Sequence, residues 1–318
     1  MERKDSRLDA AARRRLHAWY RRHRRDLPWR RTKDPYAIWV SEIMLQQTRV
    51  AAVIPYYERF LERFPDARTL ARARLDTVLA HWSGLGYYRR ARMMHAASKQ
   101  LARDGFPQGA QALRSLPGIG PYTAAAVASI AFGEHAAVVD GNVERVLCRV
   151  FGRRAKGAWV RRAAEGFLEG ARGPGDHNQA VMELGATVCT PIAPDCPRCP
   201  LSSVCAGAKD PRRYPKPPAR LRSRRVRIGV LLARRGGSVF LDRQSPGGFW
   251  DLPKASSGRV LATVSHHILD RRYEIVVRAG EARGPGRWFT PRALKRLPLA
   301  TAARKCLSQV GISVRTRP

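Results

Sequence analysis

Four cysteines lie within seventeen residues of this chain, and this spacing limits its possible folds more than any other feature. They are Cys189, Cys196, Cys199 and Cys205, spaced C-x6-C-x2-C-x5-C in the stretch CTPIAPDCPRCPLSSVC. Four thiolates at this spacing can close on one metal centre, either a tetrahedral zinc ion or an iron–sulfur cluster. Paired C-x2-C knuckles separated by a longer loop would favour zinc, and this single nested loop is unlike that arrangement.

The charge of the chain points to a polyanionic partner. Its 318 residues contain 60 Lys plus Arg against 25 Asp plus Glu, a net charge of +35. Nucleic acid is the commonest partner of so basic a protein, although a genome rich in arginine codons would produce a similar excess. The length allows one large or two medium domains, and a hydrophobic content of 44% is sufficient for packed cores.

No targeting or membrane segment is visible. The N-terminal stretch is charged throughout, and no apolar run approaches the roughly 18 residues of a membrane span. We therefore expect a soluble, cytoplasmic monomer without membrane contact, associated with the nucleoid if the source is bacterial. In that compartment the cysteines are expected to be ligands or free thiols and not disulfides.

The apolar pattern predicts a helical first domain over residues 1–207. Helical spacing occurs in residues 7–22, in 34–65 as two helices broken near Pro55, and in 69–84, 88–105, 140–152, 160–172 and 176–189. A Pro- and Arg-rich stretch, residues 208–225, predicts a linker. Residues 226–318 predict a small α+β domain, with a hairpin at Gly236-Gly237, a strand in 271–280 and one or two helices in 291–311.

The stretch LPGIGPYTAAAVASIAFG, residues 116–133, places a tight turn directly before an apolar helix. The unpaired N–H groups and the dipole of such a helix N-terminus attract anions.

The cysteine loop resembles the [4Fe-4S] loop of the endonuclease III superfamily of DNA glycosylases. The resemblance implies a mainly α, helix-hairpin-helix glycosylase fold, in which the cluster orders a basic loop, here with Arg198 and Lys209, against the DNA backbone. LPGIGPYTA looks like the hairpin of that superfamily. Gly118 and Gly120 are then expected to present backbone groups to a DNA phosphate, directly or through a bound monovalent cation.

Tyr122 stands where strand-cleaving members of the superfamily have a lysine that forms a Schiff base with the sugar. Tyrosine cannot form an imine, so the resemblance implies a monofunctional enzyme. Packing of an aromatic residue at the start of a helix is the alternative role of this side chain.

Two carboxylates are candidates for acid and electrostatic catalysis. Glu42 lies in a strongly apolar helical stretch, where burial can raise its pKa. The alternative for Glu42 is a glutamate on the protein surface. The second candidate is Asp140, for which the alternative is a helix N-cap. SEIMLQQT, residues 41–48, is similar to the signature of the adenine DNA glycosylase family, which implies that Glu42 protonates N7 of adenine. The resemblance places the second carboxylate at Asp140, with Asn142 as its supporting hydrogen-bond residue.

The same resemblance implies a set of substrate contacts. Adenine must leave the base stack to reach the two carboxylates. We expect Leu27, Trp29, Arg30 and Glu183 to form the wall of its pocket. We expect Gln46 and Gln47 to fill the gap that the base leaves in the duplex, and Tyr87 to wedge into the duplex beside the lesion.

The second domain resembles the Nudix-like domain by which adenine DNA glycosylases recognise 8-oxoguanine. GGFWDLPKA, residues 247–255, carries this resemblance, and no set of clustered glutamates that would bind Mg²⁺ is present. The family's recognition loop is expected at Val264, Ser265 and His266, with valine in place of an aromatic residue and with Ser265 and His266 contacting the lesion.

The sequence thus predicts a monofunctional glycosylase that removes adenine opposite 8-oxoguanine or guanine in double-stranded DNA. Two alternatives remain. One is a thymine-mismatch or oxidised-pyrimidine glycosylase of the same superfamily, whose members usually lack a C-terminal domain, and the other is a non-catalytic iron–sulfur protein that binds DNA.

Overall fold

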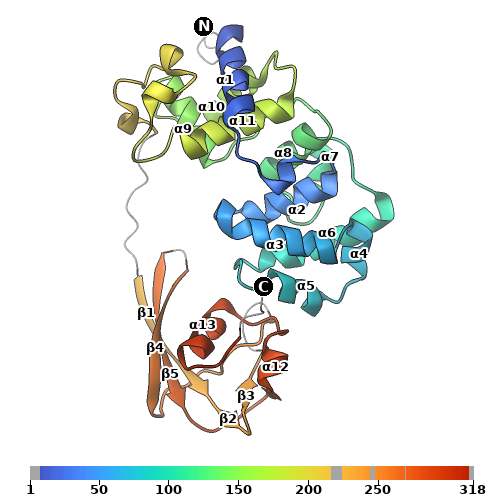
Figure 1. The fold of residues 1–318 in the computed structure, drawn as a ribbon, viewed down its shortest axis with the longest axis vertical. Helices are drawn as coiled ribbons and strands as arrows, with labels where there is room; N and C mark the ends of the chain where they lie inside the picture. Colours follow the sequence, from blue (N-terminus) through green and yellow to red (C-terminus); the bar gives the residue numbers. More distant parts are fainter. Residues whose placement is uncertain (1–7, 216–223, 244–247, 269, 315–318) are drawn as a thin grey trace. The chain divides into compact units, whose positions relative to one another are not determined.

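The computed structural model describes residues 8–215, 224–243, 248–268 and 270–314, and the chain divides into two units (Figure 1). The first unit comprises residues 1–68 and 96–218, and the second comprises 69–95 and 219–318. The sequence placed residues 69–95 in the first domain. They group instead with the C-terminal residues because Tyr88 packs on Phe249, with ring centroids 3.9 Å apart, and its hydroxyl donates to the Leu299 carbonyl over 3.2 Å.

The first unit is helical, as predicted. Its elements are α1 (Ala10–His23), η2 (Pro28–Arg30), α2 (Pro35–Leu45), α3 (Val50–Arg63), α7 (Ala110–Leu113), α8 (Pro121–Ala131), α9 (Gly141–Val150), α10 (Ala158–Leu168), α11 (Pro174–Thr187), η3 (Cys196–Arg198), η4 (Ser202–Val204) and η5 (Pro211–Arg213). Helices α4 (Ala67–Arg72) and α6 (Arg89–Asp104) each cross the division between the units. No helix in the described part of the chain is long and apolar enough to span a bilayer.

Aspartates cap the helices that carry the candidate site. The carboxylate of Asp34 accepts from the Tyr36 N–H over 3.0 Å at the start of α2. Asp140 accepts from the Val143 N–H over 2.7 Å at the start of α9. Each bond satisfies a donor that the helix itself leaves unpaired, so these two helices begin at fixed residues.

Helix α2 is buried on nearly every side and packs against α3 and α8. A second core gathers α1, α9, α10 and α11 around Leu16, Phe167 and Leu184, as their arrangement in Figure 1 shows. The two cores fix the elements that carry Glu42 and Asp140.

Two predicted helix boundaries were wrong. Pro55 lies inside α3, and the break between helices falls at residues 46–49 instead. The proline is tolerated because it and Ala51, whose carbonyl loses its intrahelical partner, are both exposed to water. The predicted helix 69–84 is interrupted after Arg72 and resumes as α5 (Leu75–Trp82). The imidazole of His95 donates to the Ala73 carbonyl over 2.9 Å and holds the chain at this interruption.

The described residues of the second unit form two three-stranded sheets. In the larger sheet, β1 (Arg224–Leu232) runs parallel to β5 (Arg271–Ala279), and β4 (Val260–Ile268) runs antiparallel to β5. The smaller sheet is antiparallel, in the order β2 (Arg234–Arg235), β3 (Ser238–Leu241) and β6 (Arg287–Phe289). Helices α12 (Pro291–Leu294) and α13 (Thr301–Gln309) complete the unit, and α13 packs against β4.

The predicted hairpin at Gly236-Gly237 is confirmed. It joins β2 to β3, and both glycines have positive φ, 52° and 77°, as a tight two-residue hairpin turn requires. The α+β character of this unit is confirmed as well.

The predicted recognition loop is wrong in its structure, because Val264, Ser265 and His266 lie within β4. They pair with Ile275, Glu274 and Tyr273 of β5. Alternation along a strand turns Ser265 to one face of the sheet, and Val264 and His266 to the face on which the core lies. Val264 is a core residue and leaves no exposed side chain to stack on a base.

Candidate active site and cysteine pocket

A cavity in the first unit brings the predicted catalytic residues together. It encloses about 850 Å³ of space not filled by atoms, part of it open to solvent, between α2, α8, α9, α11 and η2. The predicted residues in its lining are Leu27, Trp29, Arg30, Glu42, Tyr122, Asp140, Asn142 and Glu183. An adjoining cavity shares Glu42, Tyr122 and Asp140 and adds the predicted Gln46 and Gln47.

Glu42 is a buried carboxyl group on α2. Burial raises its pKa to about 7, hydrogen bonding from Tyr122 opposes this shift, and the nearby Asp140 reinforces it. Its Oε2 atom is buried and accepts no hydrogen bond from any residue that the structure describes. At neutral pH the group can therefore hold a proton and deliver it inside the cavity.

Asp140 is held in a fixed orientation. Its Oδ1 accepts from the Val143 N–H over 2.7 Å, and its Oδ2 accepts from the Asn142 amide over 2.8 Å. The Arg145 guanidinium donates to Asn142 Oδ1 over 2.8 Å and so fixes the orientation of that amide. Asp140 is thus the N-cap of α9, as the local sequence suggested, and it also lines the same cavity as Glu42.

The loop before Asp140 is anchored by Asn178 of α11. Its Oδ1 accepts from the Val138 N–H over 3.2 Å, and its amide donates to the Ala136 carbonyl and to the Ser129 hydroxyl, each over 2.9 Å. These bonds tie an irregular segment to two helices. Sequence analysis did not single out Asn178 or Arg145, because neither belongs to a motif and their partners lie elsewhere in the chain.

Tyr122 lies in the first turn of α8 and faces both carboxylates. Burial raises the pKa of its phenol, as do the nearby charges of Glu42 and Asp140. Its hydroxyl donates to Met182 Sδ over 3.6 Å. The phenol therefore stays protonated and can donate to Glu42.

Glu183 forms a buried ion cluster at the wall of the cavity. It accepts from Arg25 Nη2 over 2.7 Å and from Arg30 Nη2 over 2.8 Å, and its side chain is 0% exposed. Burial alone would raise the pKa of Glu183, but the two guanidinium groups outweigh burial and lower it to about 2. Sequence analysis missed Arg25, which is one of four arginines in the stretch RRHRRD, residues 21–26.

The predicted DNA contacts of the first unit lie at exposed turns. Gly118 has φ of 80° in the turn before α8, and a side chain at Gly120 would meet nothing within 4 Å. No side chain caps α8, so its first N–H groups remain available to an anion. Gln47 has a φ of 55°, a conformation rare for a residue other than glycine.

Tyr87 belongs to the second unit, between α5 and α6. Its backbone φ is 47°, its side chain is 43% exposed, and the Arg90 guanidinium carbon lies 5.4 Å from the ring centroid. An exposed aromatic ring is of the kind that stacks on bases, and the wedge beside the lesion stays a prediction for this position.

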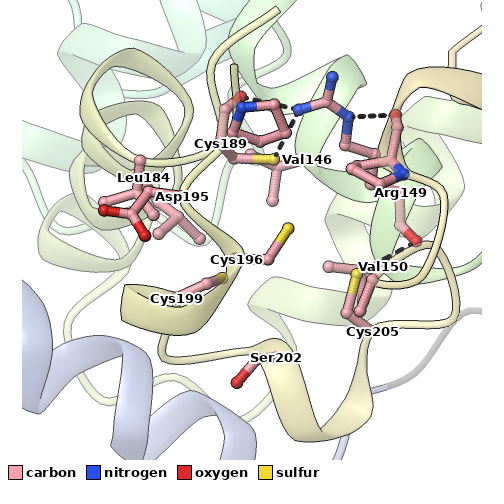
Figure 2. A pocket seen from close by; sticks show the side chains of 14 residues that line it. Val146, Arg149, Val150, Leu184, Cys189, Asp195, Cys196, Cys199, Ser202 and Cys205 are labelled. Atoms are coloured by element: carbon pink, nitrogen blue, oxygen red, sulfur yellow. Dashed lines mark hydrogen bonds between the residues drawn. The ribbon is translucent and has the colours of Figure 1, made fainter. Parts of the chain in front are cut away.

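The four cysteines line one cavity, shown in Figure 2. It contains about 380 Å³ of space not filled by atoms, including part open to solvent. Burial raises the pKa of Cys199 to about 12, and the neighbouring cysteines reinforce the shift. No three His, Cys, Asp or Glu side chains in the described residues are arranged to hold a single metal ion. Four cysteine thiols around one cavity are a donor set that suits a metal centre once the thiols lose their protons.

Comparison with known proteins relates most of the chain to enzymes of base excision. Residues 40–168 match the family model of the HhH-GPD superfamily base excision DNA repair protein. The adenine DNA glycosylase of Rattus norvegicus is 48% identical over 218 residues, which are 61% of this chain and 41% of that protein. The chain spans less than half the length of the mammalian relatives that it matches.

A relative from Schizosaccharomyces pombe, also an adenine DNA glycosylase, is 33% identical over 316 residues, which cover 76% of this chain and 68% of that protein. Among solved structures, a thermostable thymine-DNA glycosylase is similar with a TM-score of 0.58 and 29% identity, over 62% of this chain and 94% of that one. The predicted helix-hairpin-helix fold of the first unit is thereby confirmed.

Proposed function

Because the chain belongs to the adenine DNA glycosylase family, we propose that it hydrolyses the N-glycosidic bond of adenine in double-stranded DNA, opposite 8-oxoguanine or guanine. The observation that carries the proposal is the pairing of a carboxyl whose pKa is raised to about 7, Glu42, with a second carboxylate, Asp140, in one cavity. Two carboxyl groups whose surroundings differ in this way suit an acid and a charge stabiliser.

Each residue of the cavity has a defined task in this reaction. Glu42 donates its proton to N7 of the flipped adenine, which makes the base a neutral leaving group. Asp140 stabilises the positive charge that develops on the sugar as the bond breaks, and Asn142 keeps its Oδ2 in place. Tyr122 supplies a phenol and no amine, so the sugar–phosphate backbone stays intact.

The wall of the cavity supports recognition of adenine. Trp29 and Leu27 offer apolar surface to the base, while Glu183 with Arg30 offers fixed polar groups to its edge. We assign Gln46, Gln47 and Tyr87 to the duplex around the extruded nucleotide. The exposed turn at Gly118 and Gly120, with the uncapped N-terminus of α8, supports a phosphate contact, direct or through a monovalent cation.

We assign a [4Fe-4S] cluster to the cysteine pocket, with Cys189, Cys196, Cys199 and Cys205 as ligands. When bound, such a cluster is capable of one-electron redox chemistry, but base removal does not require it. With the cluster bound, its four cysteine ligands would order the loop 189–205. The loop would then hold Arg198, whose side chain is 75% exposed, toward the DNA backbone.

The second unit is proposed to read the base opposite adenine, as the Nudix-like domain of the family does. Ser265 and His266 lie on opposite faces of the larger sheet, so they cannot both contact one edge of a lesion. Ser265, on the exposed face, is the residue that we assign to 8-oxoguanine.

The test is a single-turnover assay on a labelled duplex with adenine opposite 8-oxoguanine, analysed with and without alkali. Strand breaks that appear only after alkali are expected, because alkali cleaves the abasic site that base removal leaves. Matched duplexes with guanine opposite adenine, a thymine mismatch or an oxidised pyrimidine define the substrate. Release of thymine or of the oxidised pyrimidine, without release of adenine, would contradict the proposal.

A further inference from the structure

Arg149 is a buried guanidinium for which no carboxylate partner exists among the described residues. It lies near the end of α9 and is 2% exposed. All its hydrogen-bond acceptors are backbone carbonyls and one sulfur. Carbonyl groups satisfy the N–H donors, but they leave the unit positive charge uncompensated, which is costly inside a protein.

The acceptors of Arg149 lie at both ends of the cysteine loop. At its start, Nη1 donates to Cys189 Sγ over 3.2 Å and to the Thr190 carbonyl over 2.8 Å. Beyond its end, Nε donates to the carbonyls of Pro211 and Tyr214 over 2.8 and 3.0 Å. Figure 2 shows the guanidinium beside Cys189 at the rim of the cysteine pocket.

The backbone of Arg149 holds the last cysteine as well. Its carbonyl accepts from the Gly207 N–H over 2.8 Å and lies 3.4 Å from Cys205 Sγ. A Cβ at Gly207 would come within 2.7 Å of this carbonyl oxygen, so only glycine allows the approach. One residue therefore contacts the first and the last cysteine.

We propose that Arg149 is the counter-ion of the cluster and the clamp that holds the two ends of its loop. The inference rests on the proposed cofactor, since four thiolates around a cluster carry the negative charge that the buried guanidinium lacks. A cation and a hydrogen bond at a ligand sulfur both favour the more negatively charged, reduced state of the cluster. The clamp at residues 189–191 and 211–214 slows opening of the loop.

The test compares the full-length protein with Arg149→Gln, Arg149→Lys and the control Arg198→Gln. Arg198 lies between Cys196 and Cys199 in the sequence, and Arg198→Gln also removes one positive charge. This side chain is 75% exposed, so water screens its charge. The measurements are iron and sulfide content, the reduction potential at an electrode, and the rate of cluster loss to a chelator.

In Arg149→Gln, we expect a lower reduction potential than in Arg198→Gln, and cluster loss to the chelator about 10–100-fold faster than in the wild type. Arg149→Lys keeps the charge and loses the planar fork, so we expect a potential near that of the wild type with accelerated cluster loss. Two results would overturn the assignment of Arg149 as counter-ion. One is a reduction potential that shifts from the wild-type value no more in Arg149→Gln than in Arg198→Gln, and the other is an equal fall of the potential in Arg149→Lys.

If Arg149→Gln retains no cluster, the iron content of Arg149→Lys decides. If only Arg149→Lys contains iron, the role of Arg149 as counter-ion is supported. If neither variant contains iron, that role is overturned. The wild-type protein separates this inference from the cofactor proposal, because zinc, or no iron and sulfide, in the wild type contradicts the cofactor itself. Base excision is measured separately and enters neither decision.

Discussion

Asn142 donates its side-chain amide to Asp140 over 2.8 Å, two residues away along the chain. The bond fixes the orientation of the carboxylate from the first turn of α9, where the backbone N–H of Val143 holds its other oxygen. Arg145, one turn further on, fixes Asn142 in turn and also donates to the Gly185 carbonyl over 2.7 Å. A single helix start thus holds the carboxylate that we propose as the stabiliser of the developing cation.

Replacing Asn142 by alanine should slow base release without weakening DNA binding. Asp140 keeps its backbone bond to Val143, but its Oδ2 is then free to turn away from the sugar. A misplaced catalytic group costs about 10²-fold in rate, which is our expectation for the single-turnover rate constant. The dissociation constant for a duplex carrying a non-hydrolysable adenine analogue should stay within about twofold, and a parallel loss of binding would contradict a positioning role.

Gly185→Ala tests the same relationship from the opposite helix. A Cβ at Gly185 would lie 2.6 Å from Asn142 Cβ and 3.1 Å from its carbonyl oxygen, so α9 must shift. We expect a slower rate than in Gly141→Ala, because a Cβ at Gly141 meets nothing within 4 Å. Equal rates in the two glycine variants would show that the helix contact does not control Asp140.

The rate of base release should fall as the pH rises through about 7, the value to which burial raises the pKa of Glu42. The acid is protonated below this pH, and above it the rate drops about tenfold per pH unit. Glu42→Gln cannot supply a proton, so we expect a loss of about 10²–10⁴-fold and no alkaline limb. Single-turnover rates across the pH range measure both.

Tyr122→Phe provides the control for this assignment. Hydrogen bonding from Tyr122 lowers the pKa of Glu42, so its removal should move the alkaline limb to higher pH. A limb that stays in place in Tyr122→Phe and persists in Glu42→Gln would mean that another group titrates.

Tyr122→Lys should add strand cleavage to base removal. The new amine would stand beside Glu42 and Asp140, where it can attack the sugar and form a Schiff base. The expected product is a strand broken without alkali, and borohydride should trap a covalent complex of enzyme and DNA. Tyr122→Phe offers no amine and serves as the matched control, which should yield strand breaks only after alkali.

Local signals predicted most helices, because their caps and periodicity lie in short stretches. Helix α8 follows its glycines and begins with Pro121, as the turn signal indicated. The same local reasoning was wrong at Pro55, because a proline on an exposed helical turn only removes a bond that water replaces. The family resemblance, and not local reasoning, predicted a loop at residues 264–266, and this was wrong because these residues lie in a strand with alternating burial.

The site was predicted where residues belong to motifs and missed where distant residues pair. Arg25 meets Glu183 across 158 positions, and Arg149 meets Cys189 across 40. In a chain with 60 basic residues, no local pattern distinguishes a buried arginine from an exposed one. Such residues become recognisable only when folding removes them from water.

The ion cluster of Glu183 should make the stability of the chain depend on acid. The pKa of Glu183 is lowered to about 2 in the folded state, from an ordinary value of 4.5. The contribution is therefore fully present above about pH 4.5, is lost as the pH falls towards 2, and amounts to about 3 kcal/mol.

Glu183→Gln should lower the free energy of unfolding at pH 7 by about 3 kcal/mol, because it leaves Arg30 buried without a counter-charge. Arg25 contributes less to this loss, because its side chain is 39% exposed. Denaturant unfolding between pH 7 and pH 3 measures the effect, with the exposed Glu62→Gln as the matched control. The difference between wild type and Glu183→Gln should shrink as the pH falls below 4.5. A difference that stays constant to pH 3 would mean that packing, and not the ionised carboxylate, stabilises the wall of the cavity.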